Sequence, residues 1–340
     1  MRTWRACAAC LLICAAAQPA SSPRPTGFQR QIMSQTRSLE WSTGRLEHTL
    51  RSLQVPQAAD ASGANSVRWG ILGSGLICSD FVQALRSIEG AEVTAVAARS
   101  LASAQKFAAA NNIPTAFGSY DELMACADVE IIYIGTIHPA HKAQTIKAMK
   151  AGKHVLCEKP MTCSRADTAE LVKVAAEQGV LLVEALWTRF FPNVQKAREI
   201  IADGGIGEVL QVQGDFGFRF PDVDDAGVKH RLTDPAMAGG ATLDIGVYPL
   251  SCLLLAFGPD PPAKVVAAGA LTASGVDKNV SVSISSHSNQ VASLSWSIEC
   301  QTPEEWRILG SAGMIIFEGP ACVTFGVMVL RAGHMEKMYR

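Results

Sequence analysis

The sequence has few features of a nucleic-acid-binding, membrane-spanning or disordered protein. Its formal net charge is −1, so no basic surface for nucleic acid or anionic lipid is expected. Aromatic residues make up only 6% of the chain and charged residues 18%, whereas hydrophobic residues reach 48%, which excludes a disordered chain. No uninterrupted apolar run approaches the ~20 residues of a membrane-spanning helix. A chain of 340 residues with this composition predicts two globular domains.

The ten cysteines form neither a disulfide framework nor a zinc pattern. Cys7, Cys10 and Cys14 lie near the N-terminus, and the Cys7–Cys10 spacing of a metal knuckle has no second Cys or His pair behind it. No metal site is therefore predicted. The other cysteines are odd in number and scattered through apolar segments, which is typical of buried thiols packed as small hydrophobes.

Residues 1–66 are predicted to be a targeting or flexible leader. A basic start is followed by an apolar run at 6–17, which is too short to span a bilayer but long enough for a signal-peptide core. The stretch after it is rich in Ser, Gln, Arg and Pro. A secretory or bipartite organelle signal is expected. A flexible leader without a signal, or an upstream start codon that is seldom used, remains the alternative.

A dinucleotide-binding pattern begins at Val67. A short apolar strand at 67–72 runs into Gly73-Ser74-Gly75-Leu76-Ile77-Cys78, and a helix at 79–87 and a second strand at 93–98 follow. Strand, Gly-x-Gly turn, helix and strand form the context in which this motif binds a dinucleotide. One glycine permits the tight turn, and the other lets the backbone approach the pyrophosphate at the helix N-terminus. The cofactor-binding candidates here are Gly73, Ser74, Gly75, Leu76 and Ile77.

The end of the second strand favours NADP over NAD. NAD sites place Asp or Glu at this position to bind the ribose 2′-hydroxyl. This chain has Ala97-Ala98-Arg99-Ser100, where a guanidinium and a hydroxyl suit a 2′-phosphate. The alternative is that Arg99 is an ordinary solvated residue after a strand.

Further strand–helix units predict a doubly wound parallel sheet. Strands are expected at 129–134, 154–157 and 180–184, with helices at 101–111, 120–126, 140–150 and 165–177. Ligands of such sheets lie beyond the carboxyl ends of the strands. Polar residues at these ends extend the cofactor-binding candidates: Thr136, His138, His141, Glu158 and Lys159.

Several segments together resemble the glucose–fructose oxidoreductase and inositol dehydrogenase family. They are Gly73-Ser74-Gly75, Thr136-Ile137-His138-Pro139-Ala140-His141-Lys142, Gly152 to Pro160 with its Glu158-Lys159-Pro160, Glu184 to Pro192, and Gly239 to Tyr248. The last two are similar to the branch of dihydrodiol dehydrogenases and NADP-dependent D-xylose dehydrogenases. The resemblance runs from about residue 67 into the 320s.

The resemblance implies that Lys159 and Tyr248 are catalytic and that Asp244 orients the substrate. Oxidation of a carbinol requires loss of the hydroxyl proton as hydride leaves the same carbon. A free phenol titrates near ~10, and a nearby ammonium favours its ionised form. Tyr248 is thus expected to act as acid/base with Lys159 tuning it. Without the resemblance, a solvated lysine and a core tyrosine are the simpler interpretations.

Three more side chains are site candidates with weaker support. Trp187 and Arg189 follow a strand end, where an indole would wall the nicotinamide pocket and a guanidinium would bind phosphate or substrate. Core packing is the alternative for Trp187. Phe216 is a candidate apolar wall of the substrate site.

The second half has strand periodicity at 209–218, 263–271, 279–287, 291–298, 306–309 and 314–317. These segments predict an α+β domain with a mainly antiparallel open sheet. The expected division is 1–66 leader, 67–190 dinucleotide-binding domain and 191–340 substrate and dimerisation domain, with a homodimer expected by analogy with relatives. Relatives continue for several dozen residues past the last of these strands, and 327–340 does not resemble a substitute. The resemblance therefore implies a truncated C-terminus.

The sequence thus predicts an NADP-dependent oxidoreductase that acts on a dihydrodiol or a cyclic sugar such as D-xylose. The rival is a truncated, catalytically inactive NADP-binding member of the family. A biliverdin-type reductase would share the nucleotide half but would not require Asp244 and Tyr248. Neither the aromatic diol nor the pentose is preferred by the sequence.

Overall fold

The computed structural model describes residues 66–225, 230–323, 327–331 and 334–339. The chain forms two compact units, and the sequence passes from the first to the second between Trp187 and Thr188. Apart from Ser66, the leader predicted at 1–66 lies outside the described residues, so the targeting signal stays a prediction.

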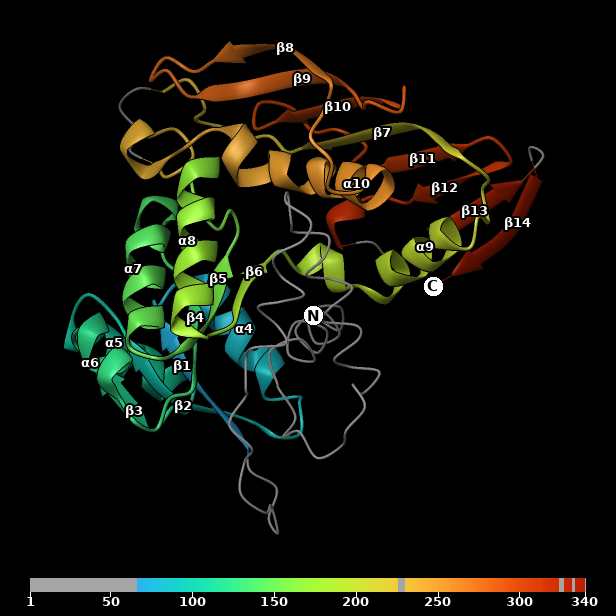
Figure 1. Ribbon diagram of the computed structural model, residues 1–340. Coiled ribbons are helices and arrows are strands. Elements are labelled where there is room, and N and C mark those ends of the chain that lie inside the picture. The colour runs from blue at the N-terminus through green and yellow to red at the C-terminus, as the bar shows by residue number, and fades with distance from the viewer. Residues whose placement is uncertain (1–65, 226–229, 324–326, 332–333, 340) are drawn as a thin grey trace. The chain divides into compact units, whose positions relative to one another are not determined.

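The first unit is built on a six-stranded parallel sheet with the order β3-β2-β1-β4-β5-β6 (Figure 1). This order confirms the predicted doubly wound sheet, and its switch point lies between β1 and β4. The three-residue β3 was not predicted. The strands are β1 (Val67–Leu72), β2 (Ala91–Ala97), β3 (Thr115–Phe117), β4 (Ile131–Ile134), β5 (His154–Glu158) and β6 (Leu182–Ala185).

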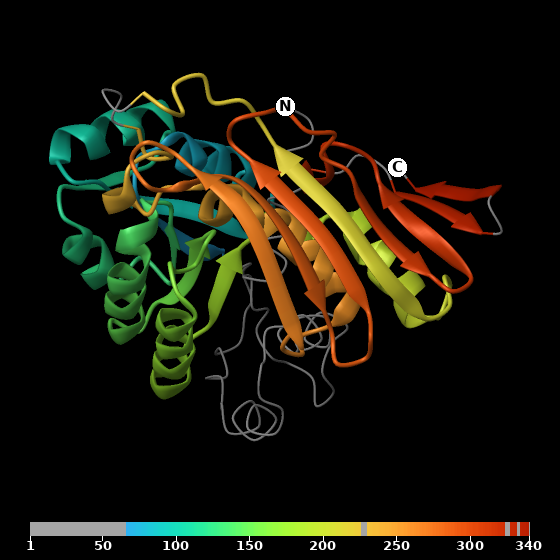
Figure 2. The same cartoon turned by 90° about the horizontal axis from the view of Figure 1, so that it is seen from above.

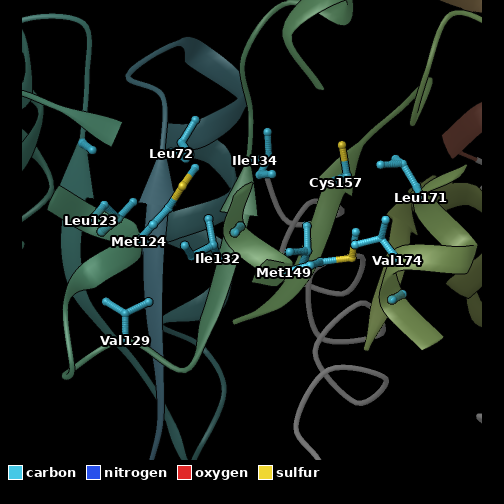
Figure 3. Packing of buried hydrophobic residues seen from close by; sticks show 14 of the residues in the cluster. Leu72, Leu123, Met124, Val129, Ile132, Ile134, Met149, Cys157, Leu171 and Val174 are labelled. Atoms are coloured by element: carbon cyan, nitrogen blue, oxygen red, sulfur yellow. The ribbon is translucent and has the colours of Figure 1, made fainter. Parts of the chain in front are cut away.

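Helices cover the sheet of the first unit because its central strands are apolar on both faces. All four residues of β4 are buried. Ile132 and Ile134 join the core cluster that also holds Met149, as Figure 3 shows, whereas Tyr133 alternates to the other face and stacks on Phe81. The helices are α4 (Leu76–Leu85), α5 (Leu101–Ala110), α6 (Tyr120–Ala125), α7 (His138–Lys150) and α8 (Arg165–Gln178). Of these, α4 begins three residues earlier than predicted, directly after Gly75.

The second unit carries an eight-stranded sheet with the order β14-β13-β12-β11-β7-β10-β9-β8, seen from above in Figure 2. Neighbouring strands are antiparallel except β7 and β10, which confirms the mainly antiparallel prediction. Two strands at 327–331 and 334–339 were not predicted, and they extend the sheet beyond β12. The strands are β7 (Val209–Gly217), β8 (Lys264–Leu271), β9 (Asp277–Ser285), β10 (Val291–Ser297), β11 (Trp306–Gly310), β12 (Gly313–Phe317), β13 (Val327–Arg331) and β14 (His334–Tyr339).

One long apolar helical segment packs on this sheet. The π-helix η3 (Thr242–Gly246) continues directly into α10 (Val247–Phe257), which contacts β7, β10 and β11. The segment Pro235–Phe257 is long and apolar enough to cross a membrane by composition, yet half of its apolar window is buried inside the protein. Packing on the sheet accounts for its apolar character. A further helix, α9 (Pro192–Ala202), contacts α10 and β13.

Candidate functional site

Two loops meet at the switch point of the first sheet. Gly73, which begins the tight turn after β1, has φ +121°, a conformation that favours glycine. A Cβ on Gly73 would lie 2.8 Å from the carbonyl oxygen of Gly135, in the loop after β4. The buried thiol of Cys78 donates to the same oxygen at 3.3 Å, and burial raises the pKa of this thiol to about 12. Neither loop could take a larger side chain here.

Gly75 is glycine for a different reason. Its backbone is extended, with φ −82° and ψ 177°, and among the described residues a Cβ would meet no atom within 4 Å apart from those of its chain neighbours. The protein itself therefore does not require glycine at this position. Gly75 precedes α4, whose first turn holds no acidic residue and receives no side-chain cap. Exposed amides at a helix N-terminus beside an unobstructed backbone fit the pyrophosphate of a dinucleotide.

The side chains around this cradle are accessible. Ser74 is exposed, Leu76 is 88% exposed and Ile77 is half-buried. Ile137, in the loop after β4, is also exposed although it is apolar. Sequence reasoning did not select Ile137 as a site residue; an apolar residue inside a polar loop was the available signal.

At the end of β2, Arg99 and Ser100 are both exposed. The Ser100 hydroxyl caps α5, because it accepts a hydrogen bond from the Ser103 amide at 3.3 Å and donates to the Ser103 hydroxyl at 2.9 Å. Partial burial raises the pKa of Tyr120, and the positive charge of Arg99 opposes this shift. The charge of Arg99 therefore acts on the Tyr120 phenol. The sequence did not predict this interaction.

The buried His141 links the loop after β4 to the loop after β5. His141 on α7 has Nδ1 2.9 Å from the Pro160 carbonyl oxygen and Nε2 3.2 Å from the Thr136 carbonyl oxygen. Burial lowers the pKa of His141, so the neutral ring donates to one of these two carbonyls. Both ring nitrogens face acceptors, and the edge of His138 lies against the ring with centroids 5.9 Å apart.

Lys159 lies in a turn whose backbone is held by hydrogen bonds to surrounding side chains. Its amide donates to Glu158 Oε2 at 3.2 Å, and the Met161 amide donates to Glu184 Oε1 at 2.8 Å. The His141 contact holds the Pro160 carbonyl between them. Main-chain groups at three successive residues are thus bound by side chains, which fixes the backbone from which Lys159 projects.

The second unit brings two predicted residues into contact and holds a third on the same helical segment as one of them. Phe216 on β7 stacks against Tyr248 on α10, with ring centroids 5.1 Å apart and planes at 25°. Asp244 lies four residues before Tyr248, on the π-helix, and both residues are buried. Short π-helical turns that join α-helices often occur at functional sites.

The start of this π-helix is anchored to the sheet. Asp277 Oδ2 accepts hydrogen bonds from the amide and the hydroxyl of Thr242, both at 2.7 Å. The Trp296 indole donates to the same hydroxyl at 2.9 Å. A Cβ on Gly246 would lie 2.9–3.2 Å from the Trp296 ring, so the helix sits directly on the indole.

Asp244 also has a cationic partner that sequence reasoning missed. Arg231 donates from Nη1 to Asp244 Oδ1 at 2.7 Å. The carboxylate is almost fully buried, whereas the arginine side chain is 53% exposed. Arg231 lies 13 residues upstream in an irregular segment, where no sequence pattern marks a pairing.

The remaining candidates lie where the chain passes between the units. Trp187 and Arg189 belong to the 3₁₀ helix η1 (Trp187–Phe190). Between them, Thr188 donates to the Cys322 carbonyl at 2.6 Å, which attaches this helix to the second unit. Lys159 belongs to the first unit and Tyr248 to the second.

Comparisons with known proteins agree with this architecture. The model described as "Oxidoreductase family, NAD-binding Rossmann fold" matches residues 67–186, and the GFO/IDH/MocA C-terminal domain matches residues 194–316. The trans-1,2-dihydrobenzene-1,2-diol dehydrogenase of cattle (Bos taurus) is 41% identical over 273 residues, which cover 80% of this chain and 79% of that protein.

Solved structures share the fold. The NAD binding oxidoreductase from Klebsiella pneumoniae has a TM-score of 0.73 at 22% identity, with 80% of this chain and 79% of that chain covered. The 3-ketoreductase KijD10 from Actinomadura kijaniata, in complex with NADP and TDP-benzene, has a TM-score of 0.68 at 26% identity, with 81% and 84% covered.

The fold and these matches define an oxidoreductase with a Rossmann nucleotide-binding domain, and they support a nicotinamide dinucleotide as its cofactor. The chain belongs to the glucose–fructose oxidoreductase and inositol dehydrogenase (GFO/IDH/MocA) family.

Proposed function

We propose that this chain is an NADP-dependent dehydrogenase that oxidises a CH–OH group of a trans-dihydrodiol or of a cyclic aldose such as D-xylose. The observation that carries the proposal is the cradle at Gly75, where neither the backbone conformation nor the packing of the described residues requires glycine. The 41% identity with a trans-1,2-dihydrobenzene-1,2-diol dehydrogenase supports the diol as substrate.

The choice of NADP rests on Arg99 and Ser100. Both are exposed after β2, and no carboxylate stands there to bind a ribose 2′-hydroxyl. Arg99→Asp should weaken NADP⁺ binding at least tenfold and shift the preference toward NAD⁺, with Arg86→Asp on the same unit as the exposed control. Dissociation constants for both nucleotides measure this. Unchanged NADP⁺ preference in Arg99→Asp would contradict the assignment.

In the proposed reaction Tyr248 accepts the hydroxyl proton of the substrate. The ammonium of Lys159 stabilises the phenolate, and the buried Asp244 orients a second hydroxyl. When bound, the oxidised nicotinamide accepts the hydride that leaves the carbinol carbon, so the products are a carbonyl compound, the reduced nucleotide and a proton. The stacking of Phe216 on Tyr248 supports this assignment, because it limits the positions open to the phenol.

The experiment is a substrate panel followed by absorbance of the reduced nicotinamide. A trans-dihydrodiol and D-xylose are each offered with NADP⁺ and with NAD⁺. Tyr248→Phe should lower kcat by about 10²–10⁴-fold, whereas Tyr120→Phe, which removes a phenol on α6, should not. Lys159→Met should behave like Tyr248→Phe, with the exposed Lys173→Met as its control. A protein that binds NADP⁺ but oxidises neither substrate would instead support an inactive nucleotide-binding chain.

We also propose a homodimer that forms through the open face of the eight-stranded sheet. Paired residues share a face, so Ser283, Ser293, Gln213 and Arg307 form one row across four strands. Most of this row is exposed, whereas the residues that alternate with it are buried. Ser293→Arg should weaken self-association in sedimentation equilibrium, and a wild-type protein that stays monomeric at all concentrations would contradict the dimer.

A further inference from the structure

A buried polar pair lies behind the turn that carries Lys159. The hydroxyl of Tyr133, on β4, donates to Glu158 Oε1 at 2.6 Å, and both residues are buried. The other oxygen of the carboxylate, Oε2, accepts the amide of Lys159 at 3.2 Å. Glu158 therefore joins a phenol on the neighbouring strand to the main chain of the proposed catalytic lysine.

The phenol of Tyr133 is itself held in place. Its ring stacks on Phe81 of α4, with centroids 3.9 Å apart and planes at 7°. Phe81 in turn contacts Trp69 of β1, at 5.5 Å between centroids. The same helix begins at Gly75, so the packing connects the phosphate cradle with the Lys159 turn. A rigid donor at a fixed position is what a buried carboxylate requires to stay hydrogen-bonded.

The ionisable groups around Glu158 come from each element packed on it. Burial raises the pKa of Glu158 to about 7; the hydrogen bond from Tyr133 and the charge of Lys159 lower it, and Glu184 raises it. Burial also raises the pKa values of Tyr133, Cys78 and Cys157, so these three groups are neutral near pH 7. The groups are Cys78 on α4, Tyr133 on β4, Cys157 on β5, Lys159 after β5 and Glu184 on β6.

We propose that Glu158 is a positioning residue for Lys159, held by Tyr133, and that its gain or loss of a proton changes the anchoring of that lysine. In the ionised state the carboxylate accepts a charge-assisted hydrogen bond from the Lys159 amide and interacts electrostatically with the side chain of Lys159. In the protonated state the amide keeps a weaker acceptor and the ammonium loses its neighbouring anion. The proposal rests on the proposed function only in giving Lys159 a role in the reaction.

The first test needs neither cofactor nor substrate. The full chain is labelled with carboxyl-¹³C glutamate, and the resonance absent from Glu158→Gln is followed by NMR against pH. It should titrate with a midpoint near the pKa of about 7. Tyr133→Phe should raise this midpoint by about one pH unit, because it removes a hydrogen bond to the anion. A midpoint near ~4.3, the ordinary pKa of glutamate, or a midpoint unchanged in Tyr133→Phe, would overturn the proposal.

The second test asks whether Lys159 responds. In protein labelled with ε-¹³C lysine, the signal absent from Lys159→Arg should shift with the same midpoint as Glu158, and both midpoints should move together in Tyr133→Phe. The exposed Lys173 on α8 serves as the control and should not follow that midpoint. A Lys159 signal that does not change while Glu158 titrates would refute the coupling.

Kinetics separate this proposal from the proposed function. If a substrate is turned over, the acidic limb of the pH profile of kcat should follow the Glu158 midpoint and move to higher pH in Tyr133→Phe. A purely structural loss would lower kcat at every pH without moving the limb. Coupled NMR titrations in a protein that oxidises no carbinol would sustain the positioning pair and reject the dehydrogenase assignment.

Discussion

The same substitution at the two glycines of the turn after β1 should have opposite consequences. At Gly75 an alanine methyl would meet no atom of the rest of the described chain within 4 Å, on a backbone that any residue adopts. At Gly73 the methyl would lie 2.8 Å from the Gly135 oxygen, on a backbone with φ +121°. Gly75→Ala therefore tests whether the turn binds the cofactor, and Gly73→Ala tests whether the turn is needed for the stability of the fold.

The expected free energies of unfolding follow from these surroundings. Gly75→Ala gains about 0.4–1 kcal/mol by restricting the unfolded chain. It loses a similar amount because Gly is a better N-cap residue than Ala. The net change should lie within about 0.5 kcal/mol of wild type. Gly73→Ala combines about 1–3 kcal/mol of backbone strain with about 1–3 kcal/mol of overpacking, so a loss of about 2–6 kcal/mol is expected.

For cofactor affinity, Gly75→Ala is the informative substitution. A methyl at Gly75 occupies the space through which the pyrophosphate approaches, so the Kd for NADP⁺ should rise at least tenfold, equivalent to about 1.4 kcal/mol. Urea unfolding measures the stability of both variants, and calorimetric titration measures the Kd of the folded Gly75→Ala protein. Wild-type affinity for NADP⁺ in a stable Gly75→Ala protein would refute the assignment of Gly75 to pyrophosphate binding.

Three further predictions concern the supports of the site. Asp277→Ala removes both hydrogen bonds to Thr242 and should lower the free energy of unfolding by about 2–4 kcal/mol in urea, whereas Asp277→Asn, which keeps an acceptor, should lose less. Gly246→Ala should cost about 1–3 kcal/mol by forcing a methyl into the Trp296 ring, and unchanged stability in the same assay would mean that the helix does not rest on the indole. Because burial raises the pKa of Glu158 from 4.5 to about 7, the folded state binds its proton more tightly, so this group's contribution to stability should fall by about 3 kcal/mol as pH rises through that window. The stability difference between wild type and Glu158→Gln, measured by urea unfolding across this pH range, should change by that amount, and a constant difference would contradict the buried carboxyl.

The doubly wound sheet was predictable because its signals are local. Most strands of the first unit are short apolar runs that end within two residues of a Gly or a polar residue, and a helix follows most of them within a few positions. The strand Thr115–Phe117 escaped because three residues are too few for a periodicity. The helix Pro192–Ala202 begins immediately after a 3₁₀ turn and was not predicted. The strand Val327–Arg331 was not foreseen because residues 327–340 did not resemble the segment that follows Met314–Phe317 in relatives, so no element was assigned to them.

The contacts of the candidate site depend on register, which single segments do not reveal. Tyr133 looks like a core residue within an apolar strand, and its partner Glu158 lies 25 residues later on a parallel neighbour. The pairing follows only once Tyr133 is placed opposite Leu156 in the sheet. Arg231 pairs with Asp244 across an irregular segment, where the backbone path decides the contact.

Both units use the same device to hold the residues proposed for the site. A hydrogen bond between a carboxylate and a main-chain amide lies near each of them. Glu158 accepts the Lys159 amide, and Asp277 accepts the Thr242 amide two residues before Asp244. Asp215, adjacent to Phe216, accepts the Glu304 amide at 2.6 Å. Hydrogen bonds to an ionised acceptor are roughly twice as strong as neutral ones, and a backbone amide has no rotamer freedom to lose. The backbone is therefore fixed at these points by side chains that need not touch the substrate. Neutral amide substitutions of these carboxylates should for that reason disturb catalysis through position, and their effect should be smaller than that of truncation to alanine.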